Sequence, residues 1–569
     1  MRLTSCLLVT ALFLSANTTS GATQEAVVAP VPAALPAPQA YPSDAMTLAR
    51  MEKLAEDHPG WMTKSTIGKS ERGVAIDAWT ITKPNAGRRP ALLVVAGIDG
   101  VHLFSTQCAV AAAEAALAGD QGALEHASLI VIPVLNPDAR AIAFVTSTPT
   151  ASTVQTVDDD RDGVSDEDAP QDMNGDGVIT MMRLKTRAGR TSTHLVDTVD
   201  PRIVRTPDAA KHEHATHELF VEGRDTDHDG RISEDALGGT DLNRNFPHRW
   251  PEFAMDAGAY PLSAMESLAF AEFVAAHPEI ASAVIFGVAD TLAEFPDSKD
   301  MDATGNTPLL YHADDHAMYM EMAKAWKDAS KCEKAIDIAH GDLAGSLVLW
   351  LADHRGIAAV TTSAFARPDA PEPAEDAPAV IATGDAEQQA WLEYSDRVFG
   401  GNGFIAWKEF VHPDLGVVEI GGWRPFFREQ PSAIDAAAIA LAQGEGVKAI
   451  LALAPRLEIE SLTVTPVSNG LVRINLSLTN TGALPTTTKM DTTARARGPI
   501  LVRINIPPSQ FFNGKPVERV ERISAGGSAQ LSFTVLGTPG QRSVLSVEAP
   551  GFPRMEREIL FPAATEAAR

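Results

Sequence analysis

An aspartate and a histidine, Asp99 and His102, lie three residues apart in the stretch AGIDGVHLF. The apolar run ALLVVAGI that leads into them is typical of a buried strand, and the glycines mark a turn after it. A carboxylate and an imidazole at the end of a strand are both competent ligands for zinc. The pair therefore indicates either a metal site or the remains of one that had better ligands.

Three acidic stretches, DDDRDGVSDED (158–168), DMNGDGVIT (172–180) and DTDHDGRISED (225–235), place an oxygen ligand at alternate positions before a glycine. Such side chains converge on one hard cation, as in a Ca²⁺ loop. The expected calcium ligands are Asp158, Asp160, Asp162, Asp172, Asn174, Asp176, Asp225, Asp227 and Asp229. The twelfth loop positions hold Ala169, Arg183 and Ala236 instead of Glu, so these are not standard EF-hands. A solvated acidic loop is the alternative, but three such stretches favour at least one structural Ca²⁺.

The chain is acidic and long enough for more than one domain. It has 569 residues, with 47 Lys and Arg against 74 Asp and Glu, and a formal net charge of −27. Two domains with extensions are expected at this length. The negative charge disfavours nucleic acid and anionic lipid as partners, and it favours cation binding.

The amino terminus resembles an export signal. One Arg, an apolar run from Leu7 to Leu14 and small residues before position 22 predict a signal peptide over residues 1–22 and a secreted or periplasmic protein. The apolar run is far shorter than the ~20 residues that a membrane span needs. A Pro/Ala-rich linker is expected over residues 23–42. Only Cys108 and Cys332 remain after cleavage, and whether they pair stays open.

Predicted strands and helices alternate along residues 43–450, and they would position the candidate residues. Stretches such as VAIDAWTIT, ALLVVAGI and SLIVIPVLN predict strands, whereas STQCAVAAAEAAL and SAMESLAFAEFVAAH predict helices. An α/β domain follows, with an acidic insertion over about residues 156–236. From about residue 456 to 565, short alternating runs between Gly, Pro and Asn turns predict a β-sandwich domain.

Six segments in order make residues 43–450 resemble the zinc carboxypeptidases of the carboxypeptidase A type, in a secreted bacterial branch with acidic insertions. The segments are HPGWMTKSTIGKSERGVAIDAWTIT, LLVVAGIDGVH, VIPVLNPDAR, DDDRDGVSDEDAPQDMNGDGVITMMR, GGTDLNRNFPHRW and HPDLGVVEIGGW. The resemblance implies a mixed sheet flanked by helices. It also implies one Zn²⁺ held by a His-x-x-Glu pair and a later His, with a Glu as general base. Three protein ligands and one open position let zinc activate a water molecule.

The resemblance implies three zinc ligands and one general base, and all four of these positions hold other residue types here. Asp99 and His102 stand where the family has the zinc-binding His and Glu. Gly287, counted back from Pro296, stands where the second His is expected, and Ser363 stands at the general-base position. Neither glycine nor a neutral hydroxyl can replace those groups, so the zinc chemistry is expected to be lost.

The substrate-binding residues implied by the resemblance, here called the substrate clamp, are better preserved than the zinc positions. Asn243 and Arg244 in DLNRNFP match the pair that binds a peptide's C-terminal carboxylate, and Arg183 matches the Arg that polarises the scissile carbonyl. A guanidinium can make two parallel hydrogen bonds to a carboxylate. A structural ion pair within the same segment is the alternative role for Arg244.

Three functions from different classes follow. The first is an exported, Ca²⁺-stabilised protein without catalysis that binds peptide or cell-wall peptide C-termini. The second is an active metallocarboxypeptidase with a rebuilt site, in which Asp290 joins Asp99 and His102 as a third ligand. The third is a structural envelope protein. Glu419 is a candidate substitute base, although a structural role is favoured for it.

Overall fold

The computed structural model describes residues 35–119, 121–156, 163–166, 168–233, 239–296, 301, 305, 309–334, 343–370, 382–468 and 470–562. The expected signal peptide over residues 1–22 and residues 23–34 of the expected linker lie outside this part of the chain. Within the described residues, no helix combines the length and the apolar character needed to cross a bilayer. Cys108 and Cys332 are both free thiols, the first of them buried.

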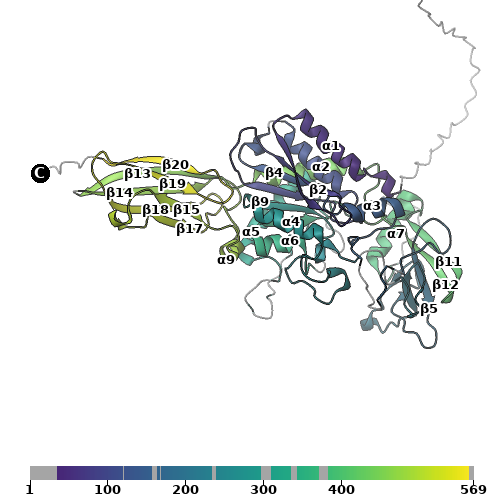
Figure 1. Ribbon diagram of the computed structural model, residues 1–569. Coiled ribbons are helices and arrows are strands. Elements are labelled where there is room, and N and C mark those ends of the chain that lie inside the picture. The colour runs from purple at the N-terminus through teal and green to yellow at the C-terminus, as the bar shows by residue number, and fades with distance from the viewer. Residues whose placement is uncertain are drawn as a thin grey trace, which may run out of the picture.

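A six-stranded mixed sheet forms the centre of the α/β region (Figure 1). Its strands are β1 (Met62–Lys69), β2 (Ala75–Ile81), β3 (Ala91–Val95), β4 (Ser128–Ile132), β9 (Ile280–Phe286) and β10 (Ala358–Thr362), in the order β1-β2-β4-β3-β9-β10. The pairs β4-β3, β3-β9 and β9-β10 are parallel, while β1 and β2 are added antiparallel at one edge. Strands β3 and β4 are buried along their whole length, as expected for strands covered on both faces.

Helices pack around this sheet. They are α1 (Asp44–Asp57), α2 (Ser105–Leu117), α3 (Pro137–Thr146), α4 (Met265–Ala276), α5 (His316–Ser330), α6 (Leu347–Leu349) and α8 (Ala436–Ala452), whereas α7 (Ala386–Phe399) belongs to a separate aromatic cluster. Small residues let α2 and α8 approach closely, because a Cβ added at Gly444 would lie 2.5 Å from the carbonyl oxygen of Ala111. A π-helical turn over Trp350–His354 follows α6 and leads into β10.

A second, antiparallel sheet lies beside the first one. It has the order β11 (Phe404–His412), β12 (Gly416–Trp423), β5 (Met181–Lys185) and β8 (His217–Val221), so the acidic insertion contributes two strands to it. Met182, Leu184, Val418 and Ile420 belong to a separate small core under this sheet. The insertion also contains the short pair β6 (Leu195–Val196) and β7 (Val204–Arg205).

The carboxy-terminal part is mainly β and includes a short helix, α9 (Lys489–Ala494), and Figure 1 shows it on the side of the main sheet away from β5, β11 and β12. Its two four-stranded sheets have the orders β13-β14-β18-β16 and β17-β15-β19-β20. The strands are β13 (Leu457–Ser468), β14 (Leu471–Asn480), β15 (Ile500–Ile504), β16 (Phe511–Asn513), β17 (Val517–Val520), β18 (Ser528–Leu536), β19 (Arg542–Glu548) and β20 (Met555–Leu560). Inward residues of both sheets, such as Ile474 and Val547, form one core. The predicted fold class, a mixed α/β sheet with a carboxy-terminal β-sandwich, is confirmed.

Candidate functional site

Three neighbouring parallel strands end at the substituted positions. Asp99 follows β3, whereas Gly287 and Ser363 follow β9 and β10 directly. The Gly287 amide donates to the Thr362 carbonyl over 3.0 Å, and a Cβ at Gly287 would lie 3.4 Å from Ile98 Cδ1. Ligands of open α/β sheets bind outside the carboxyl ends of the strands. The structure therefore brings these positions together at the edge where a binding site is expected.

Asp99 and His102 are bonded to each other. His102 Nδ1 lies 3.1 Å from Asp99 Oδ2, and Asp99 Oδ1 accepts from the amides of Val101 and His102 at 2.8 and 2.6 Å. Burial by itself raises the pKa of Asp99, but the charge of His102 and these hydrogen bonds outweigh burial and lower it. Burial lowers the pKa of His102, but the carboxylates of Asp99, Glu429 and Asp241 outweigh burial and raise it. The arrangement is a buried ion pair.

The loop that carries this pair is held by the segment before α8. The Gln430 side chain accepts from the Phe104 amide over 2.9 Å and donates to the Val101 carbonyl. Gln430 is almost fully buried, with 1% exposed, so these bonds form away from water. Glu429, next to it, is therefore brought near His102.

Asp241 and the two clamp residues share one helical turn beside this pair. The Asp241 side chain caps the turn Leu242–Arg244 by accepting from the Asn243 amide over 2.8 Å. Burial, together with the charge of Asp99, raises the pKa of Asp241 to about 7. Asn243 Oδ1 accepts from the Leu347 amide over 3.3 Å, and Arg244 Nε donates to Asp256 Oδ1 over 2.8 Å. The ion pair between Arg244 and Asp256 is the structural role that was considered as the alternative for Arg244. The Asp256 side chain is 48% exposed.

The remaining candidates for catalysis have structural partners. The Ser363 hydroxyl donates to the Phe365 carbonyl over 2.7 Å. Asp290 accepts from the Thr362 hydroxyl over 2.7 Å and from the amides of Leu292 and Ala293. The Asp290 carboxylate thus caps the loop after β9.

The residues at this sheet edge do not fit a zinc ion. Zinc in a peptidase takes three side-chain ligands. Here Asp99 and His102 are turned to each other, and Gly287 has no donor atom. Among the described residues, Asp99, His102 and Asp290 are not a group of three whose ligand atoms all lie within 4.8 Å of one another.

Arg183 and Glu419 lie opposite each other in the second sheet, on β5 and β12. Arg183 Nε donates to Glu419 Oε2 over 2.8 Å, and its Nη1 donates to the Pro201 carbonyl over 2.7 Å. The guanidinium also lies over the Trp407 ring, 4.5 Å from its centroid. These contacts are structural, and a role for Arg183 in polarising a substrate carbonyl stays a prediction.

The second acidic stretch is held by its own backbone. Asp172 accepts from the amides of Gly175, Asp176 and Gly177, while Asn174 and Asp176 side chains accept from amides two residues ahead. Glu222, fully buried, accepts from the amides of Met173 and Thr180 and fixes the ends of this loop. Asp158, Asp160 and Asp162 of the first stretch lie outside the described residues.

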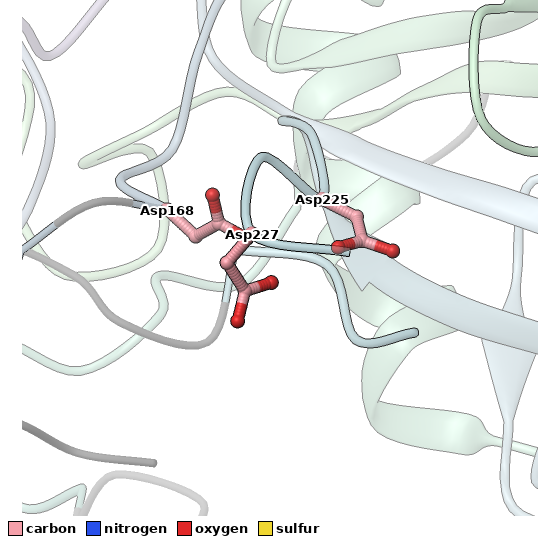
Figure 2. Close-up of side chains that lie close together, drawn as sticks. All are labelled: Asp168, Asp225 and Asp227. Carbon is pink, nitrogen blue, oxygen red and sulfur yellow. The ribbon is translucent and has the colours of Figure 1, made fainter. Parts of the chain in front are cut away.

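The third acidic stretch contributes to a group of carboxylates that sequence analysis did not assemble. One ligand atom each from Asp168, Asp225 and Asp227 lies within 4.8 Å of the others, and Figure 2 shows the three side chains gathered around one loop. Among the described His, Cys, Asp and Glu residues, no other such group of three exists. Asp229 accepts from the Arg231 amide over 2.7 Å and is not a member of the group. The chain therefore has an acidic group that can hold a metal ion.

Comparison with known proteins finds family models for two parts of the chain. Residues 47–163 match the family model described as zinc carboxypeptidase, and residues 456–559 match a domain of unknown function. The match covers β1 to β4 and the loop with Asp99 and His102, and it confirms the resemblance. Residues 47–163 are therefore similar to the zinc carboxypeptidase family. No curated protein matches the chain.

Several solved structures resemble the fold at low sequence identity. Carboxypeptidase A from Helicoverpa armigera is 15% identical, with a TM-score of 0.34 and coverage of 64% of this chain and 73% of that chain. A metallo-carboxypeptidase from Burkholderia cenocepacia is 10% identical, with a TM-score of 0.30 and coverage of 72% and 70%. Thrombin-activatable fibrinolysis inhibitor is 15% identical, with a TM-score of 0.32 and coverage of 57% and 68%. These likenesses concern the fold alone.

Sequence analysis missed Asp241, Glu429 and Asp168. Asp241 stands in the quoted motif DLNRNFP, two residues before Asn243, and this proximity was a usable signal. Glu429 and Asp168 come from other segments, so only their tertiary contacts connect them to Asp99 and to Asp225.

Proposed function

We propose that the protein is an exported carboxypeptidase-like protein that binds peptide or cell-wall peptide C-termini and does not hydrolyse them. The observation that carries this proposal is the mutual bonding of Asp99 and His102 at the family's zinc positions, 3.1 Å apart between Nδ1 and Oδ2. With Asp99 and His102 bonded to each other and no side chain at Gly287, these positions do not supply the three ligands that a catalytic zinc takes.

Arg244 is the proposed anchor for the peptide carboxylate. It lies one helical turn from Asp241, whose charge acts on both Arg244 and the Asp99–His102 pair. Its contact with Asp256 is partly exposed, so a ligand carboxylate can compete for the guanidinium. Asn243 keeps its amide nitrogen for the ligand, since the described contact uses its oxygen.

The wider assignment has three parts. Residues 1–22 are proposed to direct export to the periplasm or outside the cell. Residues 43–450 are proposed to form the binding domain and residues 456–565 a separate β-sandwich domain. Calcium is proposed to bind the acidic loops, with Asp172, Asn174, Asp176, Asp225, Asp227 and Asp229 as the described candidate ligands.

Calorimetry with matched peptides tests the binding function. Peptides with a free C-terminus should bind, and the same peptides with an amidated C-terminus should bind at least about tenfold more weakly, which corresponds to the loss of one charge-assisted contact. Equal affinities would rule out the carboxylate clamp. Release of the C-terminal residue during the titration, measured by mass spectrometry, would instead support an active peptidase.

A further inference from the structure

We propose that Asp168, Asp225 and Asp227 form one divalent-cation site, suited to Ca²⁺, that joins the two ends of the segment between them. This inference sharpens the calcium part of the proposed function, because it replaces separate loops by a site shared between two of them. Asp168 stands at the end of the first acidic stretch and was not among the expected ligands. The peptide-binding function does not depend on it.

The spacing of the three carboxylates suits calcium. Ca²⁺ binds oxygen at 2.3–2.6 Å, so two ligands on opposite sides of one ion are about 4.8 Å apart. One oxygen of each aspartate lies within 4.8 Å of the others. Mg²⁺ binds oxygen at about 2.1 Å with a stricter octahedral geometry, and it keeps several water molecules. Three carboxylate donors fit the flexible all-oxygen coordination of Ca²⁺, so calcium is the favoured ion.

A buried oxygen of one of the three aspartates points to a ligand. Asp225 has only 9% of its surface exposed, and its Oδ1 has no hydrogen-bond partner among the described residues. Its Oδ2 accepts from the Gly230 amide over 3.2 Å. An unpartnered buried carboxylate oxygen is costly, and a bound cation would satisfy it. Asp172 in the second stretch differs, because backbone amides of its own loop bond both of its oxygens.

The arginine next to the three aspartates already has another carboxylate as its partner. Arg224, next to Asp225, forms an ion pair with Asp414, with Nε 3.3 Å from Oδ2. The Asp168 carboxylate also accepts from the Thr226 amide at 2.9 and 3.1 Å. Among the described residues, Arg224 is thus already paired with another carboxylate, and a divalent ion would lower the repulsion among the three aspartates.

The position of the group explains what the ion would do. Strands β5 and β8 are antiparallel, with Met181 opposite Val221, so the chain that enters β5 and the chain that leaves β8 lie at the same end of the second sheet. The Gln171 amide donates to the Glu222 carbonyl over 2.8 Å and continues this pairing. An ion held by Asp168, Asp225 and Asp227 would bridge the two segments next to this end, and it would stabilise the sheet that contains Arg183.

The test uses the full chain, freed of metal with a chelator and then titrated with CaCl₂ or MgCl₂ by calorimetry. The wild type should bind Ca²⁺ more tightly than Mg²⁺. D168N and D225N should each weaken Ca²⁺ binding by at least about tenfold, as expected when one charged ligand is lost. D208N is the matched control, because Asp208 lies in the same insertion and caps a separate turn. It should bind Ca²⁺ as the wild type does.

Thermal unfolding separates loss of the site from loss of folding. Without metal, D168N and D225N should be at least as stable as the wild type, because one of three repelling charges is gone, but Ca²⁺ should no longer stabilise them. If D225N weakens binding and D168N does not, calcium binds one loop, and the shared site is wrong while the calcium proposal stands. If the wild type binds no Ca²⁺, both fail. Neither result bears on peptide binding.

Discussion

His102 Nδ1 lies 3.1 Å from Asp99 Oδ2 at the carboxyl end of β3, so the two residues that the resemblance assigns to the first zinc positions bind each other. Burial strengthens this pair, because charges attract more strongly where water is excluded. A metal ion could bind both His102 Nδ1 and Asp99 Oδ2 only by breaking the bond between them.

The wild type is therefore expected to bind little zinc. Substitution of the family's ligands into the chain should restore zinc binding. The wild type should retain well under one zinc per chain after dialysis, measured by mass spectrometry. D99H/H102E/G287H should retain close to one, because these changes supply three side-chain ligands. Position 287 can accept a side chain, since the nearest atom to a Cβ there would be the end of the Ile98 side chain, at 3.4 Å. Stoichiometric zinc in the wild type would overturn the proposed loss of catalysis.

The ion pair between Arg244 and Asp256 predicts opposite effects for its two members. R244K should weaken binding of a peptide with a free C-terminus by about tenfold or more, since lysine cannot make two parallel hydrogen bonds. D256N should strengthen it or leave it unchanged, because the guanidinium loses a competing carboxylate. Calorimetry measures both, with R542K in the β-sandwich as the control. Weaker binding by D256N would mean that Asp256 supports the clamp.

A buried pair outside the clamp makes stability depend on pH. His248 Nε2 lies 3.3 Å from Asp353 Oδ2, and the two residues are 3% and 7% exposed. Burial, helped by the charge of Asp315, raises the pKa of Asp353 to about 8. Burial, helped by the charge of His354, lowers the pKa of His248 to about 4. The folded pair therefore keeps one proton between about pH 4 and pH 8, whichever of the two residues carries it.

The sign of the pH effect follows from proton counting. Above pH 6.5, the ordinary pKa of His, the unfolded chain has lost the protons of both residues, while the folded pair keeps one up to about pH 8. Stability should fall in this window by about 1.4 kcal/mol per pH unit, or about 2 kcal/mol in all. Below pH 6.5 both states hold about one proton, and the contribution levels off. Urea unfolding should find this decline in the wild type and not in D353N. An equal slope in both would refute the assignment.

Asp315 is predicted to tie the β-sandwich to the α/β region. Its two carboxylate oxygens accept from the amides of Lys489 and Met490 at 2.7 and 3.1 Å, at the start of α9. D315A should leave two buried donors unpaired, at a cost of about 1–3 kcal/mol each. Scanning calorimetry should detect a lower unfolding temperature or a separate transition for the β-sandwich. An unchanged trace in D315A would show that this contact contributes little.

Much of the fold followed from local patterns. The apolar runs that became β3 and β4 and the helical spacing of α2 are properties of short segments, so they could be recognised without knowing their neighbours. The resemblance added the expectation that Asp99, Gly287 and Ser363 share one site. The parallel order β3-β9-β10 agrees with it, because each residue follows the carboxyl end of its strand.

The resemblance and the residue types at its positions predicted that zinc ligands are missing, and short spacings predicted that the insertion binds cations, because both depend on which donor atoms the chain possesses. The pairing of distant segments of the chain determined which of these donor atoms come close together in space. The antiparallel pairing of β5 and β8 brings Asp168 to Asp225, and packing around the π-helical turn brings Asp353 to His248. Burial then decided the charge states of Asp241 and Asp353, since exclusion of water is a property of the packed chain and of no single segment.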